Sequence, residues 1–143
     1  MPIWSKNLPS TSRFTILPGF NNEAVMDNNT GLVWERAPSA NSQVWPQAGG
    51  YCINKNIGGT WGWRLPTVVE LKSVLDPALP PPFVSTSVFT GVQSAIYWSA
   101  TVLQDDPASA WGVFLGNGGA GNFQKADTHL LWCVRGPMQE SVY

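Results

Sequence analysis

The sequence predicts an α+β domain, because of the order in which strand and helix patterns follow one another. Strand patterns come first, two helical patterns occupy the middle of the chain, and strand patterns return in the last third. Regular strand–helix alternation, which is typical of parallel sheets, does not occur. With 143 residues the chain has the length of one ordinary domain. We expect an N-terminal arm over residues 1–12, the domain over 13–136 and a C-terminal tail over 137–143.

The composition excludes several classes of protein. Charged residues make up 12% of the chain and tryptophans number eight, whereas an average protein is about 25% charged. A disordered chain would be rich in charge and poor in aromatic residues. The apolar runs are far shorter than the roughly 20 residues of a membrane span, and the net charge of −1 comes with no basic cluster. We therefore expect a folded domain with no membrane insertion and no nucleic-acid partner.

The N-terminal strand patterns predict a strand followed by a hairpin. Residues 13–16 alternate in the manner of a strand, and residues 24–27 and 32–35 form two further strand patterns. Between the last two lies Asp27-Asn28-Asn29-Thr30-Gly31, in which Asn tolerates and Gly readily adopts the left-handed conformation of a turn. The two patterns should therefore pair.

Two helices are predicted in the middle of the chain. Over residues 44–54 the apolar side chains share one helical face; they are Val44, Ala48, Tyr51 and Cys52. The second helix begins with Thr67 as its N-cap, because Glu70 three residues later completes a capping box. Asp76-Pro77 ends it.

The last third predicts strands joined by glycine-rich turns. A proline-rich segment over residues 77–94 has no periodicity, and a loop of this length is usually functional or packed against the surface. Strand patterns follow over residues 96–99, 110–115 and 130–135, with a glycine-rich turn over 116–122.

The cysteine count leaves two interpretations open. Cys52 and Cys133 are far apart in the sequence, which excludes a CxxC redox motif, and no histidine cluster accompanies them to form a zinc site. They are either two buried free thiols or one disulfide between the middle of the chain and its last strand. We expect no metal and no cofactor.

Several short motifs occur in order along the chain. They are Asp27-Asn28-Asn29-Thr30-Gly31-Leu32-Val33-Trp34, Tyr51-Cys52, Trp63-Arg64-Leu65-Pro66-Thr67 with Glu70-Leu71, Tyr97-Trp98-Ser99-Ala100-Thr101, Ala110-Trp111 with Val113, Asn117-Gly118, and Cys133-Val134-Arg135. Together they resemble a family of bacterial secreted domains typified by the C-terminal domain of a collagen-like adhesin. The resemblance spans residues 13–135, and Trp-Arg-Leu-Pro-Thr is its most specific part.

The resemblance implies a fold, a bridge and a class of function. The fold would be C-type-lectin-like and related to formylglycine-generating-enzyme-like domains, with two helices flanking small antiparallel sheets and the N- and C-terminal strands paired. A disulfide would join Cys52 to Cys133. Relatives act in adhesion or display hypervariable residues, as in diversity-generating retroelement variable proteins. We therefore expect an extracellular, cell-surface or virion location in a bacterial or phage protein.

Other family functions find less support in this sequence. The calcium-binding strings of sugar-binding C-type lectins, Glu-Pro-Asn or Gln-Pro-Asp with Trp-Asn-Asp, do not occur. A formylglycine-generating enzyme would need Cys52 and Cys133 as free thiols. Glu35 and Glu70 are the only sensible candidates for a pair of catalytic carboxylates, and Glu70 already serves as a capping residue. His129 is the sole histidine, and we expect a surface or packing role for it rather than a catalytic one.

The tryptophans divide into two groups. By the resemblance, the core holds Trp34, Trp63, Trp98 and Trp111, with their indole N–H groups bound by loop carbonyls. If Cys133 points inward to its bridge, alternation along a strand turns Trp132 outward. An outward Trp132 would serve as a platform for a sugar or a protein, or else would pack against the arm or a neighbouring subunit.

These residues predict a ligand-binding patch and a function. The patch would contain Phe114, Asn117, Asn122, Phe123, His129 and Trp132. We expect a non-enzymatic recognition domain, an adhesin or receptor-binding module with hypervariable relatives, that binds a glycan or a host-surface protein through its C-terminal strands and loops. The alternative is a structural subunit of a virion, pilus or filament that uses its exposed aromatic residues to form a homo-oligomer or a larger assembly.

Overall fold

The N-terminal strands form an antiparallel sheet that the last strand of the chain completes. The computed structural model describes residues 10–136. Its five-stranded sheet has the order β1-β2-β3-β10-β5, with β1 Phe14–Ile16, β2 Ala24–Asp27, β3 Val33–Glu35, β10 Val134–Arg135 and β5 Trp63–Arg64. Because β10 lies between β3 and β5 and is antiparallel to both, the predicted pairing of the N- and C-terminal parts is confirmed.

The predicted hairpin forms as the turn residues indicate. Gly31 adopts a φ of 81°, and its N–H donates to the carbonyl of Asp27 at 2.7 Å. The Asp27 carboxylate is fully buried and forms an ion pair with Arg13, with 2.8 Å between Nη2 of the arginine and Oδ2 of the aspartate. A helical turn that the sequence did not predict, α1 Ser10–Arg13, brings that arginine into place. Residues 1–9 of the expected arm and the expected tail over 137–143 lie outside the described residues.

The last third of the chain forms a second antiparallel sheet. It contains β6 Ile96–Leu103, β7 Asp106–Phe114 and β8 Gly119–Gln124 in that order. β7 begins before its sequence pattern, and β8 occupies residues 119–122 of the predicted glycine-rich turn, because the ladder continues through residues without strand propensity. A two-stranded sheet pairs β4 Gln43–Val44 with β9 Thr128–His129.

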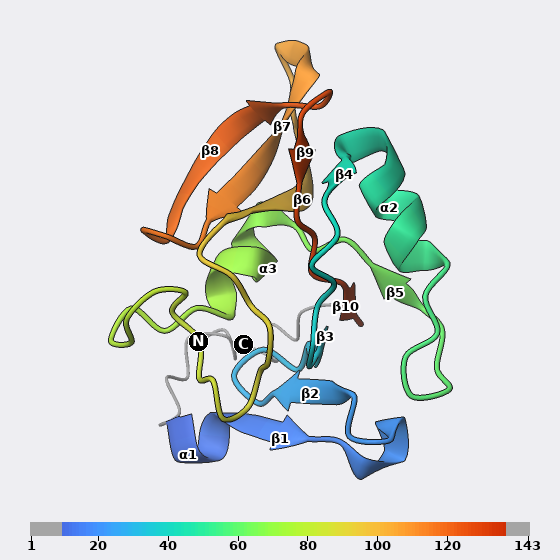
Figure 1. Cartoon of the computed structure of the whole chain (residues 1–143), viewed down its shortest axis with the longest axis vertical. Coiled ribbons are helices and arrows are strands. Elements are labelled where there is room, and N and C mark those ends of the chain that lie inside the picture. The colour runs from blue at the N-terminus through green and yellow to red at the C-terminus, as the bar shows by residue number, and fades with distance from the viewer. Residues whose placement is uncertain (1–9, 137–143) are drawn as a thin grey trace, which may run out of the picture.

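Both predicted helices are present and flank the sheets. They are α2 Trp45–Ile53 and α3 Val68–Ser73, and a short 3-10 turn, η2 Pro18–Phe20, follows β1. In Figure 1, α3 lies between the three-stranded sheet and the N-terminal strands, whereas α2 lies at the side beside β4 and β5. Within residues 10–136, no helix reaches the length and apolar character that crossing a membrane requires. The α+β prediction, with two helices and small antiparallel sheets, is confirmed.

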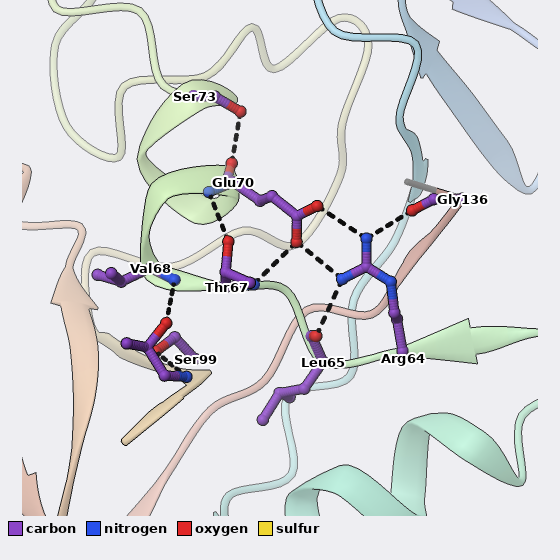
Figure 2. Close-up of polar contacts among 9 residues, drawn as sticks. Arg64, Leu65, Thr67, Val68, Glu70, Ser73, Ser99 and Gly136 are labelled. Carbon is purple, nitrogen blue, oxygen red and sulfur yellow. Dashed lines mark hydrogen bonds and ion pairs between the residues drawn. The ribbon is translucent and has the colours of Figure 1, made fainter. Parts of the chain in front are cut away.

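A hydrogen-bond network at the start of α3 explains the Trp-Arg-Leu-Pro-Thr motif (Figure 2). Thr67 accepts from the Glu70 N–H at 3.1 Å and its own N–H donates to the Glu70 carboxylate at 2.9 Å, which confirms the capping box. Arg64 forms a bidentate pair with the same carboxylate, at 2.7 and 2.8 Å. The guanidinium also donates to the carbonyls of Leu65 and Gly136. The motif therefore connects β5, α3 and the end of β10.

The core consists of two hydrophobic clusters, one on each side of the segment that leads into β10. The first contains Trp34, Phe89, Tyr97, Val113 and Leu115 among others. The second lies under α2 and contains Ala48, Cys52, Trp63, Trp98 and Ala110 among others. Residues 130–134 alternate between them, because Leu130, Trp132 and Val134 join the first cluster while Leu131 and Cys133 join the second.

The outward orientation expected for Trp132 is wrong. Its side chain is fully buried, and its ring centroid lies 5.1 Å from those of both Trp34 and Phe89. The Trp132 indole N–H donates to the carbonyl of Glu35 at 2.8 Å. Alternation along the segment does hold, but this segment is buried on both faces, as central strands often are. Neither face is left for solvent.

The other tryptophans follow the predictions in part. Trp34, Trp63 and Trp98 are buried as expected, and the last two donate to the carbonyls of Thr60 and Gln43. The indole N–H of Trp34 makes no hydrogen bond within residues 10–136. Trp111, which was also expected in the core, is only half-buried, on the face of the sheet that it shares with the exposed Asn122.

The disulfide lies within the second hydrophobic cluster and links α2 covalently to the segment that leads into β10. Cys52 on α2 and Cys133 beside β10 are bonded, with their Cα atoms 5.5 Å apart, and this confirms the disulfide interpretation. Within residues 10–136 no cysteine is free. The bridge closes a loop spanning 81 positions of sequence, which restricts the unfolded chain strongly.

Replacing both Cys52 and Cys133 by alanine should lower the free energy of unfolding by about 4 kcal/mol, because the unfolded chain regains the conformations that the bridge excludes. Denaturant unfolding of the wild type and the double variant measures the difference. A reducing agent should destabilise the wild type by a similar amount and leave the double variant unchanged. A loss below about 1 kcal/mol would contradict the assigned role of the bridge.

The Glu70 network makes stability depend on pH. Burial acts to raise the pKa of Glu70, but the hydrogen bonds from Arg64 and Thr67 and the charge of Arg64 outweigh it, so the pKa lies below its ordinary value of 4.5. The folded protein therefore releases this proton more readily than the unfolded chain does. The resulting stabilisation is present above pH 4.5 and is lost as the pH falls through the folded-state pKa.

We expect Glu70→Gln to cost about 1 kcal/mol at pH 7, where Arg64 loses a charged partner. The difference from the wild type should shrink as the pH falls below 4.5, the ordinary value for this carboxyl group. Urea unfolding between pH 3 and pH 7 measures it, with the exposed Glu23→Gln as a matched control. A difference that does not change over this range would show that the ionised carboxylate is not responsible.

Candidate functional site

One face of the three-stranded sheet brings together three of the predicted site residues. In the register of β7 and β8, Phe114 lies opposite Gly119, Gly112 opposite Gly121 and Ala110 opposite Phe123. Residues directly opposite each other share a face, and so do residues two positions apart. Phe114 and Phe123 therefore lie on the same face, with glycine backbone between them.

Two glycines of β7 and the turn after it leave room for the phenylalanine rings. A Cβ at Gly112 would stand 3.2 Å from the Phe123 ring and 2.9 Å from the Tyr97 carbonyl oxygen. A Cβ at Gly116 would collide with the Phe114 ring at 2.3 Å. Both rings thus lie against bare backbone. We call the surface formed by Phe114, Gly119, Gly121, Phe123 and His129 the aromatic face.

His129 closes one end of the aromatic face. Its ring lies edge-on to Trp98 and Phe123, with centroid distances of 4.9 and 5.3 Å. Burial lowers the pKa of His129 below its ordinary value of 6.5, although the charge of Asp127 acts in the opposite direction. The imidazole is therefore neutral at pH 7, and its buried Nε2 atom makes no hydrogen bond within the described chain. Of the surface and packing roles expected for His129, its ring contacts with Trp98 and Phe123 show the packing role.

The other predicted residues lie elsewhere. Asn122 alternates with Phe123 and so occupies the opposite face of β8, where it is exposed beside Trp111. Asn117 lies in the turn between β7 and β8 and accepts from the Gly119 N–H at 2.8 Å. Trp132 is in the core. The aromatic face therefore contains half of the six residues predicted for the patch, and whether they bind a ligand stays a prediction.

The proline-rich segment over residues 77–94 supports the core rather than the aromatic face. Phe89 is buried and packs edge-on between Phe14 and Trp132, with centroid distances of 5.2 and 5.1 Å. Phe83 adopts a φ of 66° and its ring lies over Gly118. The segment is therefore packed against the rest of the domain, which is one of the two roles expected for a loop of this length.

The candidates for catalysis do not form a shared site. The Glu70 carboxylate is bound by Arg64, whereas the Glu35 carboxylate is bound by Lys55 and by the Cys133 N–H. Because Cys52 and Cys133 are bonded to each other, the free thiols that a formylglycine-type enzyme would need are not available in this state. Among residues 10–136, no group of three or more His, Cys, Asp or Glu side chains is placed to bind a metal.

A polar cavity that sequence reasoning missed lies at the other side of the molecule. It has a volume of about 500 Å³, and its polar lining includes Asn22, Glu23, Arg36, Lys55, Asn56 and Thr90. These residues come from the turn before β2, the position directly after β3, the loop after α2 and the proline-rich segment. No motif connects them, and a surface cavity built from loops leaves no periodic signal in a sequence.

Titration of His129 tests the description of the aromatic face. It is the only histidine in the chain, so its NMR signals are unambiguous. We expect a titration midpoint below 6.5, the ordinary value, because the ring is partly buried against Trp98 and Phe123. The folded protein then binds fewer protons than the unfolded chain, so its stability decreases as the pH falls from 6.5 through the folded-state pKa.

The matched variant is His129→Phe, which keeps a ring but cannot titrate. Its free energy of unfolding should change less than that of the wild type between pH 7.5 and pH 5. A wild-type midpoint at or above 6.5 would mean that His129 is more accessible to water than the packing against its two aromatic neighbours indicates.

Comparison with known proteins identifies the family. The model of the Lcl C-terminal domain family matches residues 23–135. This range contains every strand from β2 to β10 together with α2 and α3. No curated protein matches the chain. The match covers most of the sequence and includes the disulfide and the aromatic face, and the chain therefore belongs to the Lcl C-terminal domain family.

Proposed function

We propose that this adhesin-type domain is a non-enzymatic recognition module that binds a glycan or a protein through the aromatic face. The observation that carries the proposal is the pair of phenylalanine rings on one face of the sheet, of which Phe114 lies against the backbone of Gly116 and Phe123 against that of Gly112. Large aromatic side chains at a protein surface are typical of binding sites, especially where nearby backbone groups can form hydrogen bonds with the partner. Phe114 is 37% exposed, which is unusual for a phenylalanine next to a packed core.

The aromatic face is suited to binding because it is rigid. Beneath it, Val113 and Leu115 point from β7 into the first hydrophobic cluster. Trp98 and Ala110 belong to the second cluster, which packs under α2 and is fixed by the disulfide. A ligand would therefore meet a preformed surface, and binding would order few side chains.

The charge of the face favours neutral ligand groups. Its five residues carry no full charge at pH 7, since His129 is neutral there. Sugar rings and peptide segments can both stack on phenylalanine rings and form hydrogen bonds to glycine backbone. We infer that charge attraction to sulfated polysaccharides contributes little at this face.

The proposal also includes a location outside the cell and a C-type-lectin-like fold. A disulfide-stabilised, adhesin-like domain suits an extracellular, cell-surface or virion location, because disulfides persist in oxidising compartments. Likeness to the C-type-lectin fold, with display of hypervariable residues on the C-terminal strands, is part of this proposal. Its support is the arrangement of β6, β7 and β8, in which the exposed residues of the edge strand β8 lie at the surface, where binding residues are commonly carried.

Binding to arrays of glycans and of bacterial and host surface proteins tests the proposed face. Phe114→Ala and Phe123→Ala should each weaken binding of a recovered ligand about tenfold or more, because each removes an aromatic anchor. Gly121→Val should weaken binding as well, since its side chain would occupy the backbone strip while every wild-type side chain remains. Asn122→Ala, on the opposite face of β8, is the matched control.

Thermal unfolding followed by circular dichroism establishes that each variant is folded. If both phenylalanine variants and Gly121→Val bind like the wild type, the aromatic face is not the binding surface. Loss of binding in Asn122→Ala alone would place the site on the opposite face of the sheet.

The alternative function is assembly into a virion, pilus or filament. It is favoured by further exposed apolar side chains, of which Ile53 is 64% exposed and Trp61 57% exposed at the end of α2 and in the loop after it. Size measurement by light scattering over a range of concentrations separates the two functions. A stable oligomer that Trp61→Ser dissociates supports assembly, whereas a monomer at all concentrations supports the recognition module.

A further inference from the structure

The polar cavity described above differs from the aromatic face in position and chemistry. Its residues come from the end of β3 and the segments flanking β2 and β3, from the loop after α2 and from Thr90. In Figure 1 the N-terminal strands lie at the bottom of the molecule, and the three-stranded sheet with the aromatic face lies at the top. A volume of about 500 Å³ is within the range of small-molecule sites. The cavity therefore calls for its own explanation.

A buried ion pair forms one wall of this cavity. Glu35 is 3% exposed, and its carboxylate accepts from Lys55 and, at 2.6 Å, from the Cys133 N–H. Lys55 retains further N–H donors after this contact, and its ammonium group lies 4.9 Å from the centre of the Tyr51 ring. Both charged groups are thus held in place by the fold before any ligand arrives.

The rim of the cavity carries groups whose hydrogen-bonding capacity is unused. Arg36 donates through Nε to the Val88 carbonyl and through Nη1 to the Asn22 carbonyl, which leaves the other guanidinium N–H groups available. Glu23 accepts from the Gly58 N–H through one oxygen only. The side chains of Asn56 and Thr90 make no hydrogen bond within residues 10–136.

The lining is balanced in charge and mixed in hydrogen-bond type. Glu23 and Glu35 carry negative charge, Arg36 and Lys55 carry positive charge, and Asn56 adds both a donor and an acceptor. A simple anion would approach Glu23, and a simple cation would approach Arg36, so neither is favoured. A hydroxyl group can donate to a carboxylate and accept from a guanidinium or ammonium group at the same time.

We propose that this cavity is a second binding site, which takes a neutral sugar residue through its hydroxyl groups. Adjacent hydroxyls of one sugar ring would donate to Glu23 and accept from Arg36 and Lys55, while Asn56 and Thr90 complete the contacts. The apolar parts of Ala37 and Ile57, which also line the cavity, lie where the sugar's C–H groups would pack. This site goes beyond the proposed function and does not depend on it, because the two surfaces share no residue.

Heteronuclear NMR of the labelled domain tests the site with methyl glycosides of glucose, galactose, mannose and N-acetylglucosamine as probes. We expect at least one glycoside to cause saturable shifts at residues 22–23, 36, 55–57 and 90. Glu23→Gln and Asn56→Ala should each weaken that binding at least fivefold, because the first replaces a charged acceptor by a neutral amide and the second removes a hydrogen-bonding side chain. Ala37→Trp should abolish it by filling the cavity, with no polar group removed.

The controls separate this site from the aromatic face and from other ligands. Phe114→Ala should leave the shifts at the cavity unchanged, which distinguishes failure of this proposal from failure of the proposed function. Betaine and sulfate serve as zwitterionic and anionic probes. The proposal is overturned if no glycoside gives saturable shifts, if only betaine or sulfate does, or if Ala37→Trp binds the glycoside as well as the wild type.

Discussion

The segment that leads into the last strand is the constraint on which the rest of the structure depends. Residues 130–134 run between two hydrophobic clusters and contribute side chains to both. Burying a large apolar side chain stabilises a fold by roughly 1.5–3 kcal/mol, and this segment buries five side chains in succession. Without this segment the N-terminal sheet would lack β10, and α2 would lack its disulfide partner.

Glu35 shows how the fold positions that segment. Its backbone carbonyl accepts from the Trp132 indole N–H, and its carboxylate accepts from the Cys133 N–H. Burial raises the pKa of Glu35, and the hydrogen bond and charge of Lys55 and the hydrogen bond from Cys133 only partly offset this. A buried carboxylate is costly without such partners, so the same contacts that fix residues 132–133 also hold the charged wall of the polar cavity.

Local features of the fold could be predicted from the sequence, whereas contacts between distant segments could not. The turn at Asp27 and Gly31 and the capping box at Thr67 and Glu70 depend on residues within a few positions of one another. Their chemistry is therefore complete in a short stretch of sequence. The Arg64–Glu70 pair is almost as local, but nothing in the spacing required the guanidinium to turn toward α3.

The site was harder to predict because alternation gives the face of a residue but not what covers that face. For β8 alternation correctly separates Asn122 from Phe123, and solvent reaches both faces of this edge strand. For Trp132 the same reasoning fails, since Phe89 and Trp34 cover the side that was expected to be open. The pairing of Glu35 with Lys55 joins positions that no periodicity relates. Burial is a property of the assembled fold, and so the exposed aromatic residues could be identified only after the buried ones had been placed.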